Sequence, residues 1–124
     1  MSNKIIKINR GDSFSFKLFI PTAENPTEGY RLTSNDAVYF ALLYPNQRFE
    51  DAIVIKGYDL VDQNPDNCEL FVNIIPNDTR CLTPGVYYYT VKLQRGGTLE
   101  NLHDFDEPDE VRTIIERTKF IINE

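Results

Sequence analysis

The sequence has no tryptophan, a single histidine and only two cysteines, and these scarcities exclude several kinds of site. Any catalytic arrangement that needs an imidazole must use His103, and no G-x-S-x-G nucleophile elbow accompanies it. Cys68 and Cys81 lack CxxC spacing, and no second histidine is present to complete a zinc site. We therefore expect no catalytic residue, no cofactor and no enzymatic activity.

Long apolar runs and an excess of basic residues are also missing. No stretch approaches the roughly 20 apolar residues of a membrane span, and the first residues contain no signal-peptide core. Acidic residues outnumber basic ones by 19 to 13, and the resulting net charge of −6 opposes binding to phosphate backbones. The sequence predicts a soluble protein, made in the cytosol, that binds neither nucleic acid nor a membrane.

What the chain does contain is core material for one domain. Its 124 residues are 41% hydrophobic and include seven tyrosines and eight phenylalanines. This length suits one two-layer core but not two, so we expect a single domain over residues 1–124. The spacing of Cys68 and Cys81 leaves a disulfide geometrically open. Without an export signal, however, two buried or half-buried thiols are favoured.

Short segments of alternating polarity recur along the chain and predict extended strands. Residues 37–44 are almost continuously apolar and β-branched or aromatic, which is typical of a central strand. Residues 111–122 also have partly helical spacing, but their threonine and isoleucine content favours a strand. The other expected strands are residues 4–9, 13–20, 52–56, 69–75, 86–93 and a short one at 99–102. The pattern predicts an all-β fold, a single Ig-like antiparallel β-sandwich of about seven strands.

Only Arg10, Gly11 and Asp12 separate the first two expected strands. Gly11 accepts a positive φ without strain, and the Asp12 carboxylate can accept hydrogen bonds from nearby backbone N–H groups. With Ser13, the same residues form the tetrapeptide through which extracellular matrix proteins engage integrins. A match this short has a high false-positive risk without structural context. We interpret the motif as the tight turn of a first hairpin, with the integrin ligand as the alternative.

An acidic segment follows the single histidine. Asp104, Asp106 and Asp109 belong to a run of carboxylates that could supply oxygen ligands to Ca²⁺. The spacing does not match an EF-hand loop, which needs a glycine at its sixth position and a glutamate at its twelfth. A solvated acidic loop is therefore favoured and no metal site is predicted, with a weak calcium site as the alternative.

A turn and a tyrosine-rich strand lie near residue 85. Pro84 and Gly85 are expected to set a turn, and the Tyr87 hydroxyl to reach back to the preceding loop as a tyrosine corner does. Because side chains alternate along a strand, Tyr88 should point away from Tyr87 and Tyr89. We expect one face of this strand to pack in the core and the other to contribute to a partner surface.

Three sequence groups in this order carry a resemblance: N-R-G-D-S-F-S-F, S-N-D-A-V-Y-F-A-L and N-D-T-R-C-L-T-P-G-V-Y-Y-Y-T-V-K-L. The chain resembles the small β-sandwich modules that tailed bacteriophages carry in their virions, including the N-terminal module of baseplate upper proteins. The resemblance implies a structural virion protein, as an adaptor, a capsid decoration or a tail- or baseplate-associated subunit. It implies synthesis in the bacterial host cytoplasm, and binding to other virion proteins and to copies of itself through strand edges and the loops at 21–29 and 99–111.

Two functions of other classes stay open. A cell-surface or carbohydrate-binding β-sandwich module would need surface aromatic side chains in a cleft. A small hydrolase would have to be centred on His103. Likeness of fold cannot choose among these functions, because unrelated activities share the same sandwich.

Overall fold

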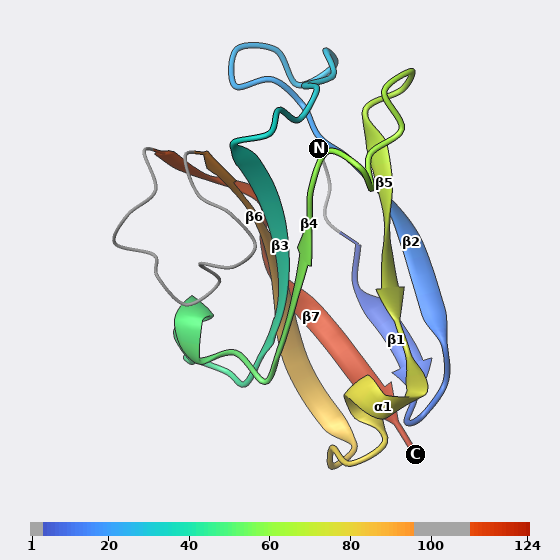
Figure 1. Cartoon of the computed structure of the whole chain (residues 1–124). Helices are drawn as coiled ribbons and strands as arrows, with labels where there is room; N and C mark the ends of the chain where they lie inside the picture. The colour runs from blue at the N-terminus through green and yellow to red at the C-terminus, as the bar shows by residue number, and fades with distance from the viewer. Residues whose placement is uncertain (1–3, 96–109) are drawn as a thin grey trace.

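The computed structural model describes residues 4–95 and 110–124. Figure 1 shows a molecule made mostly of strands. The strands are β1 (Ile6–Asn9), β2 (Phe14–Phe19), β3 (Asp36–Leu43), β4 (Val54–Tyr58), β5 (Glu69–Ile74), β6 (Gly85–Arg95) and β7 (Glu110–Asn123). A 3₁₀ turn, η1 (Phe49–Asp51), and a one-turn helix, α1 (Pro76–Thr79), complete the described elements. Among them is no helix that is both long enough and apolar enough to cross a bilayer.

The strands form two sheets of unequal width (Figure 1). The larger has the order β1-β7-β6-β3-β4, and the smaller consists of β2 and β5. This arrangement confirms the predicted all-β sandwich, while the Ig-like assignment stays a prediction. One pairing departs from the expected antiparallel pattern, because β1 runs parallel to β7 with Ile6 opposite Phe120.

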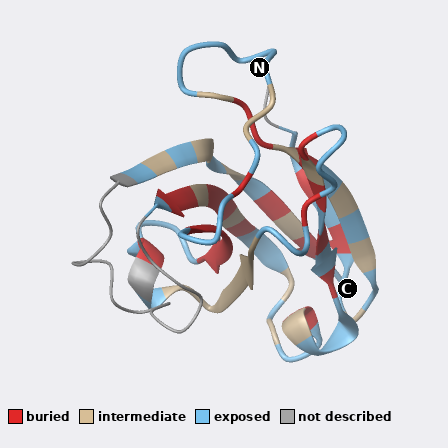
Figure 2. Cartoon of the chain, turned by 45° about the horizontal axis from the view of Figure 1, so that its top comes forward, coloured by how far each residue is buried: buried red, intermediate tan, exposed pale blue. Residues whose placement is uncertain are grey.

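The core fills the space between the sheets, and alternating burial along the strands is visible in Figure 2. From the larger sheet, Phe40 and Phe120 are fully buried, and from the smaller sheet Val72 is equally inaccessible. Strand β3 is buried on both faces, because its outward-facing Tyr39 packs with Phe49 of η1 in a second apolar cluster. The prediction of a central strand is confirmed, since β3 lies between β6 and β4.

The connection between β1 and β2 is not the hairpin that the sequence suggested. β1 belongs to the larger sheet and β2 pairs with β5 in the smaller one, so the link at Gly11 crosses between layers. Alternating polarity specifies which face of a strand is buried but not which strand it pairs with, and two adjacent strands with a short link are easily mistaken for a hairpin.

Strand β7 settles the choice between strand and helix for the C-terminal segment in favour of the strand. Its pairing with β6 is irregular, with register shifts around Val91, whose partner is Ile115. The extra residues of such a bulge bend the strand locally. As a result the consecutive residues Ile114 and Ile115 both pack against the main core. The expected short strand at 99–102 lies outside the described residues.

The cysteines and α1 depart in part from expectation. Both cysteines are free thiols; Cys68 is buried as expected, but Cys81 is exposed. The helix α1 was not predicted. It is held by Asp78, whose Oδ2 accepts the backbone N–H of Ile75 at 2.8 Å. The signal for this turn is Pro76 at its first position, where the missing N–H costs nothing.

Candidate functional site

The residues of the expected Arg-Gly-Asp turn are fixed by their backbone. Gly11 has a φ of 84° and donates its N–H to Thr79 Oγ1 at 3.0 Å. The Arg10 N–H donates to the Asn123 carbonyl at 2.7 Å, and the Asp12 N–H to the Asn9 carbonyl at 3.0 Å. The link thus joins the end of β7 to α1, which gives the motif a structural role. The side chain of Asp12 is exposed and receives no hydrogen bond from the described residues, contrary to its expected role as an acceptor.

The tyrosine-rich strand has the expected arrangement. Tyr87 and Tyr89 are 4% and 2% exposed, whereas Tyr88 is half-buried on the opposite face. The Tyr87 hydroxyl donates to the Thr83 carbonyl at 2.5 Å, the contact expected of a tyrosine corner. Pro84 precedes the strand, and Gly85 is already its first residue rather than part of a separate turn.

The proposed calcium ligands Asp104, Asp106 and Asp109 lie outside the described residues, as does His103. Within residues 4–95 and 110–124, no group of three or more histidine, cysteine or carboxylate side chains is placed to hold a metal ion.

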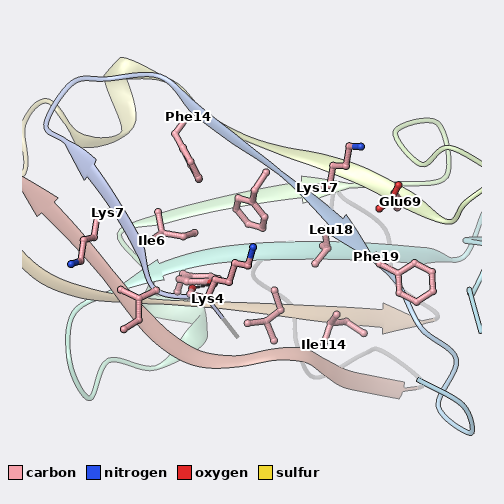
Figure 3. Close-up of a pocket in the computed structure, with 13 residues that line it drawn as sticks. Lys4, Ile6, Lys7, Phe14, Lys17, Leu18, Phe19, Glu69 and Ile114 are labelled. Atoms are coloured by element: carbon pink, nitrogen blue, oxygen red, sulfur yellow. Dashed lines mark hydrogen bonds between the residues drawn. The ribbon is translucent and has the colours of Figure 1, made fainter. Parts of the chain in front are cut away.

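An apolar groove opens between β1 and β2, with a volume of about 700 Å³ (Figure 3). It lies where the outer strand of the larger sheet passes the free edge of the smaller one. We call this hollow the edge groove. Its lining residues are Lys4, Ile5, Ile6, Lys7, Phe14, Phe16, Lys17, Leu18, Phe19, Glu69, Tyr89, Ile114 and Ile115.

The floor of the edge groove is built from aromatic and aliphatic side chains of the core. Phe16 lies 6.1 Å, centroid to centroid, from both Phe40 and Tyr89, so one wall continues directly into the packed interior. The Tyr89 hydroxyl donates to the Lys4 carbonyl at 2.5 Å and ties the start of β1 to β6. These contacts hold the groove open as a shaped surface, while Ile5 at its mouth is 54% exposed.

The rim of the edge groove is basic. Lys4, Lys7 and Lys17 are exposed around it, and Figure 3 labels them together with Glu69, the acidic residue among the described lining residues. The whole chain carries a net charge of −6, so this excess of positive charge is local. A basic rim over an apolar floor favours an acidic, partly apolar partner.

Backbone groups add polarity to one wall. The Ile20 N–H donates to the Cys68 carbonyl at 3.1 Å, on the β5 side of the chain. Because backbone groups alternate between the two sides of an antiparallel strand, those of every second residue of β2 point to its other side, toward the open edge. These residues are Ser15, Lys17 and Phe19. Strand β2 has no second partner strand among the described residues.

A second, more polar hollow lies on the outer face of the larger sheet. It has a volume of about 390 Å³ and is lined by the half-buried Tyr88 together with Arg117 and the turn after β3. The turn residues that reach it are Pro45, Asn46, Gln47 and Arg48.

The edge groove was not predicted from sequence, because its walls come from β1, β2, β5, β6 and β7, segments up to about a hundred residues apart. The only signal available was the expectation that free strand edges would act as contact surfaces. Neither the edge groove nor the outer-face hollow can be interpreted by likeness to other proteins. No protein-family model, no curated protein and no solved structure matches this chain.

Proposed function

We propose that this protein is a structural, non-enzymatic subunit of a bacteriophage virion that acts through protein–protein contacts. The observation that carries the interaction role is the edge groove, in which a free sheet edge, an apolar floor and a basic rim coincide. Monomeric proteins rarely leave a sheet edge open beside an apolar surface, because such an edge pairs readily with other chains. The virion setting rests on the resemblance of the sequence to phage β-sandwich modules.

The shape of the module suits such a role. The link at Gly11 and the tyrosine corner at Tyr87 brace the end of the sandwich near α1 by hydrogen bonds to side-chain and backbone oxygens. The Arg112 guanidinium donates to the Pro21 carbonyl at 2.7 Å and closes the far end of the same side. A braced sandwich with one open side presents a preformed surface, so little conformational entropy is lost on docking.

The experiment is electron microscopy of purified phage particles labelled with an antibody against this chain. We expect the label at one fixed position of the particle, in several copies. A chain that is found only in the host lysate and never on particles would contradict the proposal.

A carbohydrate-binding module is the second candidate, and the outer-face hollow favours it. Tyr88 offers an aromatic ring there, and Asn46 offers an amide group that can hydrogen-bond to sugar hydroxyls. Retention of the protein on a glycan column, with loss of retention in Tyr88→Ala, would support this function instead. We expect no retention.

A further inference from the structure

The two sheets differ in width, and the difference leaves room on one side only. Neighbouring strands lie about 4.8 Å apart, so a two-stranded sheet is narrower than a five-stranded one by about 14 Å. On the β5 side, Lys56 Nζ of β4 contacts Asp78 Oδ2 at 2.8 Å, and the two sheets are joined there. The uncovered part of the larger sheet therefore lies on the β2 side, where Ile114 and Ile115 are only partly buried.

The free edge of β2 has the hydrogen-bonding groups that another strand would need. The backbone N–H and C=O groups of Ser15, Lys17 and Phe19 point away from β5, toward the open edge. The opposite edge of the small sheet is already occupied in part, because the Asn73 N–H donates to the Tyr58 hydroxyl at 3.2 Å. Strand addition is thus possible at β2 and hindered at β5.

The side chains beside that edge fit an extended segment. Phe14, Phe16 and Leu18 alternate along β2 and face the groove or the core beneath it. A strand laid against β2 would share this alternation, so every second side chain would enter the edge groove next to a phenylalanine or leucine. Its intervening side chains would face the same way as the exposed Lys17 of β2, and Lys4 and Lys7 lie across the groove on the β1 side.

We propose that the edge groove binds an extended, acidic segment of another protein, which adds to the free edge of β2 as a third strand of the small sheet. Charge complementarity favours an acidic occupant, since among the described residues three lysines and one glutamate line the groove, in a chain whose net charge is −6. The segment has apolar residues at alternate positions and aspartate or glutamate between them. This inference rests on the proposed function, because it names the chemistry of the partner at the same surface.

The first experiment is a selection from an unbiased library of linear ten-residue peptides on the immobilised protein. We expect the enriched peptides to have alternating apolar residues, with aspartate or glutamate between them. Enrichment of basic peptides, of helical i, i+4 patterns or of no peptide at all would overturn the proposal. So would self-association of the protein in sedimentation equilibrium that blocks peptide binding, because the occupant would then be a second copy.

The second experiment separates strand addition from simple filling of the groove. An enriched peptide is synthesised in two N-methylated forms of equal composition, with the methyl groups on one alternate set of backbone nitrogens or on the other. A strand added to an edge uses only one of these sets for pairing. We expect one form to lose binding and the other to keep it, whereas equal affinity of the two forms would contradict strand addition.

Variants of the protein test the same surface from its own side. Because each exposed ion pair is weak, the double variant Lys7→Glu/Lys17→Glu should bind the enriched peptide about tenfold more weakly. Lys119→Glu, at an exposed lysine that pairs with Tyr88 away from the groove, is the control for a charge reversal elsewhere and should bind as the unaltered protein does. Equal affinity of the double variant and the control would overturn the charge argument.

Ser15→Pro removes one backbone N–H donor from the open edge of β2. Because proline is tolerated at sheet edges, the variant should fold with little change in the circular dichroism spectrum, but it should no longer bind the peptide. If this variant does not fold, the N-methylated peptides still decide the question. Failure of all these binding tests, together with antibody label on phage particles, would reject the strand proposal and leave the proposed function standing. Peptide binding without antibody label on phage particles would reject the proposed virion function and leave the strand proposal standing.

Discussion

The two long sides of the sandwich are built differently. On the side of β4 and β5, the Lys56–Asp78 ion pair and the hydrogen bond between Tyr58 and Asn73 join the sheets. On the side of β1 and β2, the Gly11–Thr79 hydrogen bond lies at one end and the Arg112–Pro21 hydrogen bond at the other, and the edge groove lies between them. The first side holds the fold together, whereas the second presents apolar side chains and a free edge. One small domain thereby separates a stabilising side from a binding side.

The largest expected effect comes from the floor of the groove. Phe16→Ala should lower the free energy of unfolding by about 3 kcal/mol, because the ring packs against both Phe40 and Tyr89. The matched control is Phe71→Ala on β5, whose side chain is 54% exposed and whose loss should change stability by less than about 0.5 kcal/mol. Urea unfolding measures both. Equal effects would show that the groove is not continuous with the core.

On the joined side, Asp78→Ala should destabilise the protein by about 2 kcal/mol, since it leaves the partly buried Lys56 amino group and the Ile75 N–H without their acceptor. Asp51→Ala removes the partner of Arg48 from an exposed ion pair and should cost about 0.5 kcal/mol or less. Thermal unfolding of the two variants compares them. A larger loss at Asp51 would remove the special role assigned to the joined side.

On each side of the sandwich, one tyrosine hydroxyl makes a hydrogen bond that can be removed by substitution with phenylalanine. Tyr89→Phe removes the donor to the Lys4 carbonyl, and Tyr58→Phe removes the acceptor of the Asn73 N–H. Each should lower stability by about 1 kcal/mol, the usual net value of one hydrogen bond. Only Tyr89→Phe should also weaken binding at the groove, because it releases the start of β1. Weakened peptide binding in Tyr58→Phe would break the distinction between the sides.

Alkaline pH should act on both sides at once. Burial raises the pKa of Tyr89 and of Tyr58 above 10.0, and for Tyr58 the nearby Asp62 and Asp78 raise it further. The folded state therefore keeps these protons when the unfolded state has begun to lose them. The contribution of these two hydroxyls to the free energy of unfolding should be constant below about pH 10, and it should be lost as the pH rises through their folded-state pKa values. Denaturant unfolding across this range, with Tyr89→Phe showing a shallower fall, checks the sign.

The smallest effect on stability is expected at the basic rim. Lys7→Glu/Lys17→Glu replaces two exposed side chains and should leave the free energy of unfolding within about 0.5 kcal/mol of its original value. Differential scanning calorimetry provides the measurement. A loss comparable to that of Phe16→Ala would mean that the lysines support the fold rather than a partner.

The sequence predicted the strands better than their pairing. Alternating polarity located β2 and β5 closely, and the apolar run identified β3 as central, because these features depend on neighbours along the chain. The pairing of β1 with β7 depends on residues more than a hundred positions apart, and no local pattern records it.

The candidate site was less accessible to sequence reasoning than the fold. The Tyr87 contact was expected because donor and acceptor are only four residues apart. The edge groove combines Lys4 near the N-terminus, Tyr89 in β6 and Ile114 in β7, and its existence follows from the unequal width of the sheets. Width is a property of the whole topology, so composition and spacing could not reveal it.

Amide hydrogen exchange along β2, followed by NMR, tests the central claim most directly. If the edge of β2 is open, the amides of Ser15, Lys17 and Phe19 should exchange far faster than those of their neighbours on the β5 side, and an added peptide should slow them. Uniform protection along β2 in the free protein would show that the edge is already paired, and it would contradict the account.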